Sequence, residues 1–384
     1  MPTCRRPPVS YTHLTDILKE AAQKKVSDLF IIAGRPLAFK INSQIVNYSE
    51  EILMPKETEE LISGIYQIAQ ERDMEPMLKS GDDDFSFAIA KAARFRASVY
   101  KQRGSLAAVI RVISFRLPDP LEMHIPDPVM DTADETKGLV LITGPSGSGK
   151  SVTLSCLIDR INSTRSGHII TLEEPIEFLH PHKKCIVSQR EISLDTGSYL
   201  TALRASLRQT PDVILLGELR DPETIDVAMT AAETGHLVIS TLHTLGAANT
   251  IDRIVDSFPA QKQTQIRLQL SMVLKAVISQ QLLVAKDKTM RPAFELMKVT
   301  PAVRTMIRDS KTHQIESAIH SGGKDGMISM DSSLIDLYKT GVIDRHTAIS
   351  HSFCLLYTST QKKSSSPARI HFLTVALLEK KEQS

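Results

Sequence analysis

The sequence is poor in cysteine, and this scarcity limits the chemistry that it can carry. Only four of its 384 residues are cysteines, and no two of them form a Cys-x-x-Cys pair. That spacing argues against a structural zinc site and against a disulfide framework. The thiols instead indicate a protein of a reducing compartment, the cytoplasm. The four residues are Cys4, Cys156, Cys185 and Cys354.

Long apolar runs and an excess of one charge are also missing. No apolar stretch reaches the roughly 18 residues of a transmembrane helix, and the first residues lack the apolar core of a signal peptide. The 46 lysines and arginines nearly balance the 44 aspartates and glutamates, which leaves a net charge of +2. Because dedicated nucleic-acid binders usually carry a strong basic excess, we expect no nucleic-acid partner.

Residues 1–118 show the patterns of a small α+β domain. Apolar residues three and four positions apart predict a helix near Leu14, and apolar residues at every second position then predict strands. One such strand places Phe85, Phe87 and Ile89 on a single face. Sequential alternating strands joined by short turns are typical of an antiparallel sheet.

The pattern changes beyond a proline-rich stretch. Residues 119–135 are predicted to form an extended linker because prolines recur in them. Within residues 136–350, short continuous apolar runs alternate with helical segments, which is typical of an α/β domain with a parallel sheet covered on both faces. From Pro259 to about Ser350 helical patterns dominate, so a helical C-terminal region is expected. Residues 351–384 do not continue this pattern, and no function is assigned to them.

The stretch GPSGSGKS follows one of these apolar runs and opens a helical pattern. It matches the P-loop motif G-x-x-x-x-G-K-[ST] in the strand–loop–helix context that the motif requires. Glycines let main-chain N–H groups turn toward phosphates, Lys150 reaches the β- and γ-phosphates, and the Ser151 hydroxyl binds Mg²⁺. The sequence therefore predicts a bound nucleotide with Mg²⁺. The expected nucleotide-binding residues are Gly144, Pro145, Ser146, Gly147, Ser148, Gly149, Lys150, Ser151 and Val152.

Two acidic residues stand where later apolar runs end. Glu173 ends the run HIITLE, where a carboxylate can orient or deprotonate an attacking water. Glu218 follows the run DVILLG in the manner of a Walker B acid, near Mg²⁺ and water. The alternative for either acid is a solvated strand end, which is the interpretation that we prefer for Glu174. Arg204 and Arg208 are four positions apart, and a surface salt-bridging role suits them as well as a functional one.

Two histidines bracket the apolar run in HLVISTLHT, and one metal ion cannot bind both. Seven residues of strand span about 23 Å at about 3.3 Å per residue, whereas zinc–nitrogen distances are about 2 Å. An odd offset also places the two side chains on opposite faces. We therefore expect separate roles. His243, at the carboxyl end, is the candidate for a contact with the γ-phosphate, and His236 is expected to be a structural or interface residue.

The order of these motifs resembles that of the secretion ATPases of type II secretion systems and type IV pili. GPSGSGKS, TLEEPIEF, ALRASLRQTPDVILLGELRD, AAETGHLVISTLHT and TIDRIVDSFP follow one another as they do in that superfamily. Within it, residues 14–350 resemble the PilT-type ATPases of pilus retraction and twitching motility. The resemblance implies a PAS-like N-terminal domain, a RecA-like ATPase domain, ATP and Mg²⁺ as cofactors and a homo-hexamer. It also implies a cytoplasmic location at the inner membrane, against a pilus platform protein.

The same resemblance implies roles for individual residues. Glu173 falls in the acidic Asp box as the expected catalytic base, and Glu218 is the Walker B acid that reaches Mg²⁺ through water. His236 and His243 form the His box. Arginines of the N-terminal domain approach the nucleotide in this family, where positive charge would offset charge that develops in the transition state. The candidates are Arg94, Arg96, Arg103 and Arg111.

Other functions are compatible with parts of this pattern. AVRTMIRD stands where retraction ATPases have AIRNLIRE, so a pilus-extension or type II secretion ATPase is the first alternative. A RecA-like nucleic-acid translocase also uses a P-loop, but the near-neutral charge argues against it. A nucleotide-binding regulator that does not hydrolyse its ligand needs no catalytic acid, so the presence of Glu173 and Glu218 argues against this third possibility.

Overall fold

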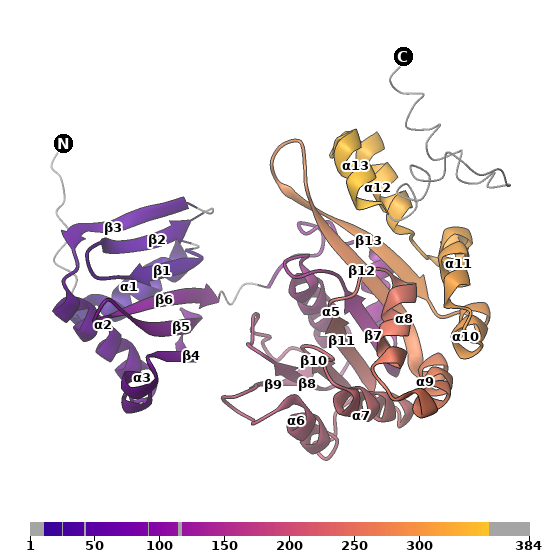
Figure 1. The fold of residues 1–384 in the computed structure, drawn as a ribbon, viewed down its shortest axis with the longest axis horizontal. Helices are drawn as coiled ribbons and strands as arrows, with labels where there is room; N and C mark the ends of the chain where they lie inside the picture. Colours follow the sequence, from indigo (N-terminus) through magenta and orange to yellow (C-terminus); the bar gives the residue numbers. More distant parts are fainter. Residues whose placement is uncertain (1–10, 25, 42–43, 91, 114–116, 353–384) are drawn as a thin grey trace. The chain divides into compact units, whose positions relative to one another are not determined.

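The computed structural model describes residues 11–352, except residues 25, 42–43, 91 and 114–116. Cys4, Cys354 and the atypical segment beyond Ser352 lie outside the described residues. The chain forms two compact units, one of residues 1–117 with 177–180 and one of residues 118–176 with 181–384. Figure 1 labels the strands and most of the helices of both units.

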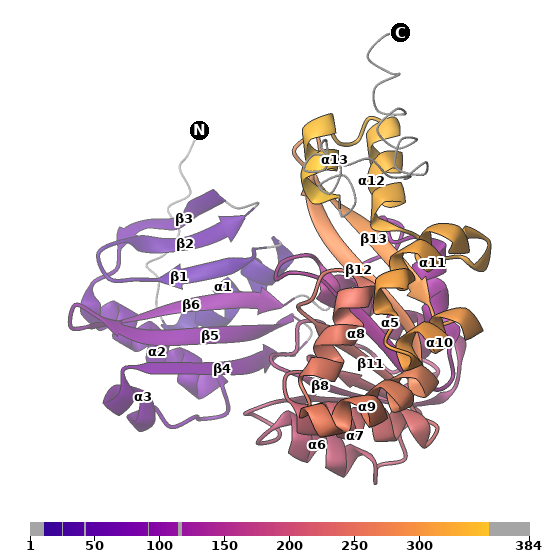
Figure 2. The same ribbon diagram turned by 45° about the vertical axis from the view of Figure 1, so that its right-hand side comes forward.

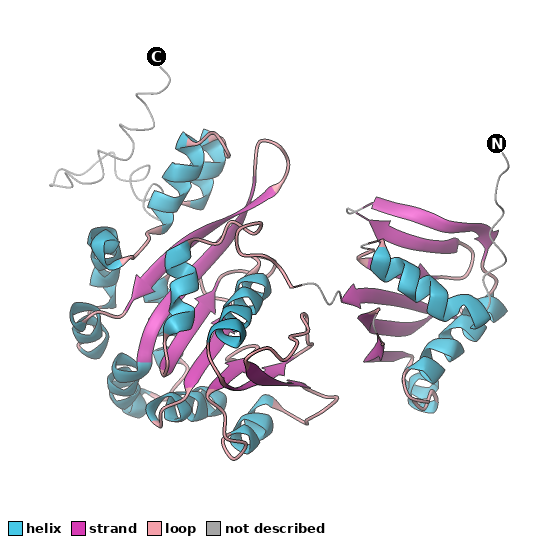
Figure 3. Ribbon diagram, turned by 180° about the vertical axis from the view of Figure 1, so that it is seen from behind, coloured by secondary structure: helices cyan, strands magenta, loops and turns pink. Residues whose placement is uncertain are grey.

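The N-terminal unit is built on a six-stranded antiparallel sheet in the order β3-β2-β1-β6-β5-β4. Its strands are β1 (Asp28–Ile31), β2 (Pro36–Ile41), β3 (Gln44–Ile52), β4 (Asp82–Ile89), β5 (Ala93–Gln102) and β6 (Ser105–Ile113). Its helices are α1 (Tyr11–Gln23), α2 (Pro55–Ile68) and α3 (Glu75–Ser80). Figure 3 shows α1 and α2 lying across one face of the sheet.

Alternation along the strands determines which face of this sheet is covered. On β5, Phe95, Ala97 and Val99 are fully buried, whereas Arg94 and Arg96, which alternate with them, are partly exposed. On β4, Phe85, Phe87 and Ile89 lie on the predicted face and are buried in the same core. The prediction of an antiparallel sheet with period-two strands is therefore confirmed, and the polar face carries the arginines.

The second unit is built on a seven-stranded sheet in the order β13-β12-β7-β11-β10-β8-β9. Neighbouring strands run parallel except β12 and β13, which are antiparallel. The strands are β7 (Gly138–Thr143), β8 (Gly167–Glu173), β9 (Cys185–Glu191), β10 (Val213–Leu216), β11 (Leu237–Leu242), β12 (Leu274–Val284) and β13 (Met290–Lys298). The parallel α/β sheet that the continuous apolar runs predict is thus present.

Helices cover both faces of this sheet. Along β7, Leu139 and Leu141 join one hydrophobic cluster, and Val140 and Ile142 join another on the opposite face. Burial on both faces is why such strands are continuous apolar runs in the sequence. One face packs against α4 (Asp127–Met130), η1 (Asp131–Asp134) and α5 (Lys150–Thr164). The other packs against α6 (Tyr199–Ser206), α7 (Pro222–Glu233), α8 (Ala247–Asp256) and α9 (Ala260–Val273).

The expectation of helix from Pro259 to Ser350 is wrong over two strands. β12 and β13 form a hairpin inside this range, and their pairing is continuous along both strands. Helix α9 ends at Val273 and β12 begins at Leu274, with no glycine or proline between them. An apolar run that passes from helix to buried strand without a break cannot be divided by periodicity alone.

The extended linker predicted for residues 119–135 is wrong in its second half. That half forms α4 and η1, and Val129 and Met130 are buried against the second unit's sheet. Pro126 stands at the N-cap of α4 and Pro128 in its first turn. Proline is tolerated at such positions because the first N–H groups of a helix have no partner within it. The prolines therefore begin a helix here rather than prevent one.

Beyond β13 the described chain is helical, as expected. The elements are α10 (Pro301–Arg308), η2 (Thr312–Gln314), α11 (Ile315–Ser321), η3 (Gly322–Asp325), α12 (Met330–Lys339) and α13 (Arg345–His351). Helix α12 packs against β13, and α13 packs against β12 (Figure 2). Among the helices of the described residues, none is long and apolar enough to span a membrane.

Candidate active site

The carboxyl ends of four neighbouring strands bring the sequence motifs together. In the sheet, β7, β11, β10 and β8 are successive and parallel. The P-loop follows β7, His243 follows β11, Glu218 lies just beyond β10, and Glu173 ends β8. Parallel strands end at the same edge, which is where ligands bind in open α/β sheets. Motifs far apart in the sequence therefore line one edge.

Close packing against β12 requires glycine at both ends of the P-loop. Gly144 has a φ of 144°, and a Cβ atom at this position would clash with the main-chain oxygen of Gln280. Gly149 has a φ of 88°, and its Cβ would lie 2.9 Å from Gln280 Nε2. Glycine reaches both backbone conformations without strain. A larger residue at either position would displace the loop from the strand beside it.

Gln280 supports the P-loop from β12, and the sequence analysis missed it. Its side chain is buried, and its Oε1 accepts a hydrogen bond of 2.8 Å from the Thr153 hydroxyl in the first turn of α5. The amide therefore connects the strand to the helix that follows the loop. Polar residues inside an apolar strand need buried partners. The two glutamines within the apolar run AVISQQLL are the sequence feature that could have indicated this supporting role.

Lys150 is buried and lies within hydrogen-bonding distance of several loop atoms. Its Nζ donates to the main-chain oxygens of Gly144 at 2.8 Å and of Pro145 at 3.0 Å. It also lies 3.5 Å from Nδ1 of His243, and that nitrogen lies 3.5 Å from Oγ of Ser146. Phosphate oxygens form stronger, charge-assisted bonds with an ammonium group than neutral carbonyls do. The geometry thus suits exchange of these carbonyls for a phosphate.

Glu218 lies between His243 and an arginine that the sequence analysis did not single out. Its Oε1 is 3.3 Å from His243 Nε2, and its Oε2 accepts from Arg220 Nε at 2.8 Å. Arg220 also donates to Glu174 Oε2 at 3.4 Å. The hydrogen bond to Glu218 raises the pKa of Arg220 above its ordinary value. In the sequence, the only feature that marks Arg220 as a site residue is its position two residues after Glu218.

Glu173 ends β8 with its carboxylate held by two neighbours. Its Oε1 accepts from the Thr171 hydroxyl at 2.6 Å and from Gln189 Nε2 at 3.1 Å. A fixed orientation is what a carboxylate needs to act on one water molecule. Nearby, burial raises the pKa of the Tyr199 hydroxyl, and the negative charge of Glu174 adds to the effect. Tyr199 therefore stays a neutral hydrogen-bonding group beside this acidic edge.

His236 lies at the opposite end of β11 from His243. Its Nδ1 is 2.9 Å from the main-chain oxygen of Ala231 and 3.2 Å from the Thr234 hydroxyl. These contacts tie the imidazole to the last turn of α7. Strand β11 runs between the two histidines, so the structure separates them and brings only His243 to the edge where the motifs meet.

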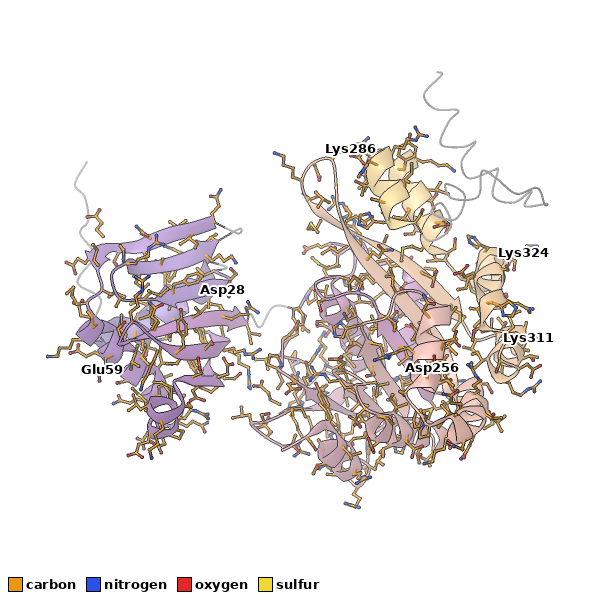
Figure 4. All side chains as sticks on the ribbon, in the orientation of Figure 1. Asp28, Glu59, Asp256, Lys286, Lys311 and Lys324 are labelled. Atoms are coloured by element: carbon orange, nitrogen blue, oxygen red, sulfur yellow. The ribbon has the colours of Figure 1, made fainter. Side chains whose placement is uncertain are left out.

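The four candidate arginines lie on two adjacent strands of the N-terminal unit and in the turn that joins them. Arg94 and Arg96 lie on β5, and Arg111 of β6 stands opposite Arg96. Arg111 Nε donates to Asp28 Oδ1 at 3.1 Å, and Asp28 is labelled on β1 in Figure 4. Arg103 lies apart from these, in the turn that joins β5 to β6. Their part in nucleotide binding stays a prediction.

Arg204 and Arg208 do not share a helix face, so the predicted arrangement is wrong. Helix α6 ends at Ser206, which leaves Arg208 in the turn that follows. Thr210 then has a φ of 48° and precedes a proline, a combination that cannot continue a helix. Both arginine side chains are exposed.

The residues at this edge fit a nucleotide with Mg²⁺. Hydroxyl and carboxylate oxygens, such as those of Ser151 and Glu218, are the ligands that Mg²⁺ prefers, alongside phosphates and water. Across the described residues, no group of three or more His, Cys, Asp or Glu side chains could hold a metal ion. The Ser148 hydroxyl is buried in the P-loop and finds no hydrogen-bond partner among the described residues. Such an orphaned group indicates a contact that a ligand completes.

Proteins similar to this chain point to one family. The sequence profile of the family described as "Type II/IV secretion system protein" matches residues 7–333. The chain is 43% identical over 335 residues to the type IV pilus retraction ATPase PilT of Pseudomonas aeruginosa, which covers 87% of this chain and 96% of that protein. It is 49% identical over 261 residues to a twitching motility protein of Neisseria gonorrhoeae, covering 68% and 70% of the two chains.

A solved structure gives the same result for the fold. The crystal structure of the pilus retraction motor PilT with bound ADP is similar to this chain with a TM-score of 0.81 and 42% identity, over 88% of this chain and 96% of that one. Sequence and fold therefore agree over both compact units. The chain belongs to the type II/IV secretion system protein family, in which pilus retraction ATPases of the PilT type are its relatives.

Proposed function

We propose that this chain is an ATP-hydrolysing motor that powers type IV pilus retraction, and through it twitching motility. The observation that carries the proposal is the convergence of Lys150, His243 and Glu218, from three different motifs, at one edge of a parallel sheet. The relative named as a retraction ATPase, and the PilT structure solved with ADP, support both the nucleotide and the direction of work.

Each motif has a separate part in hydrolysis. Residues 144–152 bind the phosphates of ATP through main-chain N–H groups and Lys150. Ser151 and Glu218 would hold Mg²⁺, the serine directly and the glutamate through water, and the ion would supply positive charge beside the phosphates. Glu173, oriented by its two hydrogen-bond donors, positions the attacking water as general base. His243 contacts the γ-phosphate from the neighbouring strand end.

The larger assembly follows from the family. In the proposal, the N-terminal unit is a PAS-like domain, the second unit is a RecA-like ATPase domain, and six copies form a ring. Arginines of the N-terminal sheet approach the nucleotide and offset negative charge in the transition state. Nucleotide-driven movements of the two units then push on a pilus platform protein at the cytoplasmic face of the inner membrane. The arginines in question are Arg94, Arg96, Arg103 and Arg111.

Replacing Glu218 with glutamine tests the proposal at its chemical step. The amide keeps the size of the side chain but removes its negative charge, so we expect phosphate release from ATP to fall about 100-fold or more. Binding of a fluorescent ADP analogue should persist, because the P-loop is unchanged. Glu223→Gln is the matched control, since Glu223 is exposed in the first turn of α7, and it should hydrolyse ATP at the wild-type rate.

The same assay separates the alternatives. Equal turnover by the wild type and Glu218→Gln would remove the catalytic role of this residue. A wild type that binds ADP but releases no phosphate would contradict the motor and favour a regulator. Single-stranded DNA should leave turnover unchanged, whereas a translocase would be stimulated by it.

A further inference from the structure

The position of His243 depends on a short connection between β11 and α8. This connection, residues 243–246, is here called the His243 loop. At its first end, Leu242 pairs with Thr143 of β7, directly before the P-loop. At its other end, Gly246 has a φ of 86° and begins α8. The contacts that fix Gly246 therefore determine where the His243 imidazole lies.

Helix α8 begins without a cap of its own. Gly246 occupies the N-cap position and has no side chain that could accept a main-chain N–H. The first N–H groups of a helix need acceptors from elsewhere. Ser279 Oγ accepts from the N–H of Gly246 at 2.9 Å, and Glu295 Oε1 accepts from the N–H of Ala247 at 2.8 Å. Both acceptors are buried.

The two acceptors are direct neighbours on the β12–β13 hairpin. Ser279 of β12 stands opposite Glu295 of β13 in the antiparallel pairing. On its other side, Ser279 lies beside Thr143, the last residue of β7 before the P-loop. One position of the sheet thus borders both the start of the P-loop and the end of the His243 loop.

The interior of the His243 loop is held to the same helix. The hydroxyls of Thr244 and Thr250 lie 2.7 Å apart, and the Thr250 hydroxyl donates to the main-chain oxygen of Gly246 at 2.8 Å. A shift of the start of α8 would therefore move the loop as a unit. His243 would move with it relative to Glu218, whose Oε1 lies 3.3 Å from the imidazole.

We propose that Ser279 and Glu295, here called the amide clamp, are positioning residues for ATP hydrolysis. By accepting the N–H groups at the start of α8, they fix His243 beside Glu218. The inference rests on the proposed ATPase function. Both side chains bind the start of α8, so the amide clamp acts on the rate of the chemical step and not on nucleotide affinity. Displacement of a contacting group from its productive geometry lowers the rate of that step steeply.

Glu295 also connects the amide clamp to the C-terminal helices. Its carboxylate accepts the main-chain N–H of Met330, the first residue of α12. Next to it, the N–H of Phe294 donates to the Ser333 hydroxyl of α12 at 3.1 Å. One carboxylate therefore satisfies the starts of two helices. Glutamine at this position keeps one acceptor oxygen but presents an NH₂ group toward donors, so one of the two bonds is lost.

The test uses steady-state phosphate release by the full chain with paired serine variants. Ser279→Ala removes one acceptor, so we expect kcat to fall about five-fold or more, with KM for ATP within about two-fold of the wild type. Ser279→Thr keeps the hydroxyl and should restore kcat. Ser271→Ala is the matched control: Ser271 is equally buried but its hydroxyl donates within its own helix α9, so kcat should not change.

Glu295→Gln extends the test to the second member of the amide clamp. It also keeps the proposal testable if Ser279→Ala does not fold. It too should lower kcat without raising KM. A wild-type kcat in folded Ser279→Ala or Glu295→Gln would overturn the inference, as would a loss that appears in KM or that Ser279→Thr does not restore. A wild type without phosphate release would instead contradict the proposed function itself. The two failures are therefore distinguishable.

Discussion

At the scale of single residues, the carboxylate of Glu218 is shared between the side chains of Arg220 and His243. Arg220 binds one oxygen and His243 approaches the other. The sequence predicted the acid and the histidine because each follows an apolar strand. It did not predict Arg220, Gln280 or the amide clamp, because no periodicity or motif marks a partner that only the order of strands brings near.

Loss of either His-box histidine should have a different effect on ATP turnover. Replacing His243 with alanine removes a group 3.5 Å from Lys150 Nζ, so we expect turnover to fall about ten-fold or more. His236→Ala removes a hydrogen bond at the end of α7, so it should leave turnover near the wild-type rate and lower the free energy of unfolding by about 1 kcal/mol.

Phosphate release and thermal unfolding of the two variants measure these effects separately. The matched pair shares one strand and one substitution, so each variant controls for the other. A larger loss of turnover in His236→Ala than in His243→Ala would overturn the placement of the catalytic histidine.

At the scale of elements, the sequence predicted four of the seven strands in the second unit and missed β9, β12 and β13. Glycine or charged residues bound β7, β8 and β10, and the two histidines bound β11, which isolates each apolar run. β12 continues directly from α9, so its pattern merges with the helix. This error also hid Ser279, Gln280 and Glu295, since a region expected to be helical cannot be placed beside β7.

The burial of Glu295 in β13 should make stability depend on pH. Desolvation raises the pKa of this carboxyl to about 7 in the folded chain, whereas an unfolded glutamate titrates near 4.3. The folded chain therefore binds the extra proton between these values. Proton binding by Glu295 therefore adds on the order of 3 kcal/mol to the free energy of unfolding below about pH 4. This contribution is lost as pH rises through 7.

Chemical denaturation of the wild type and Glu295→Gln between pH 5 and 8 measures this contribution. Because glutamine does not titrate, the variant should become more stable relative to the wild type as pH rises. Other titrating groups are common to both chains and cancel in the difference. A difference in free energy of unfolding that stays constant over this range would contradict the assignment.

At the scale of the whole molecule, the proposed motor needs both compact units. The family match and the PilT relatives extend over both, and the arginines that the family predicts near the nucleotide lie in the first. The second unit contains the P-loop, the two acids and His243 on four successive strands. The near-neutral charge argues against a nucleic-acid partner, and it says nothing of the direction in which a pilus moves.

The length of fluorescently labelled pili, followed over time in living cells, tests the central claim most directly. Cells that lack this chain should extend pili but not shorten them, and the wild-type chain should restore shortening. Lys150→Ala should not restore it, because the lysine that binds the phosphates is gone. Shortening at the wild-type frequency in the deletion strain, or its recovery with Lys150→Ala, would contradict the account.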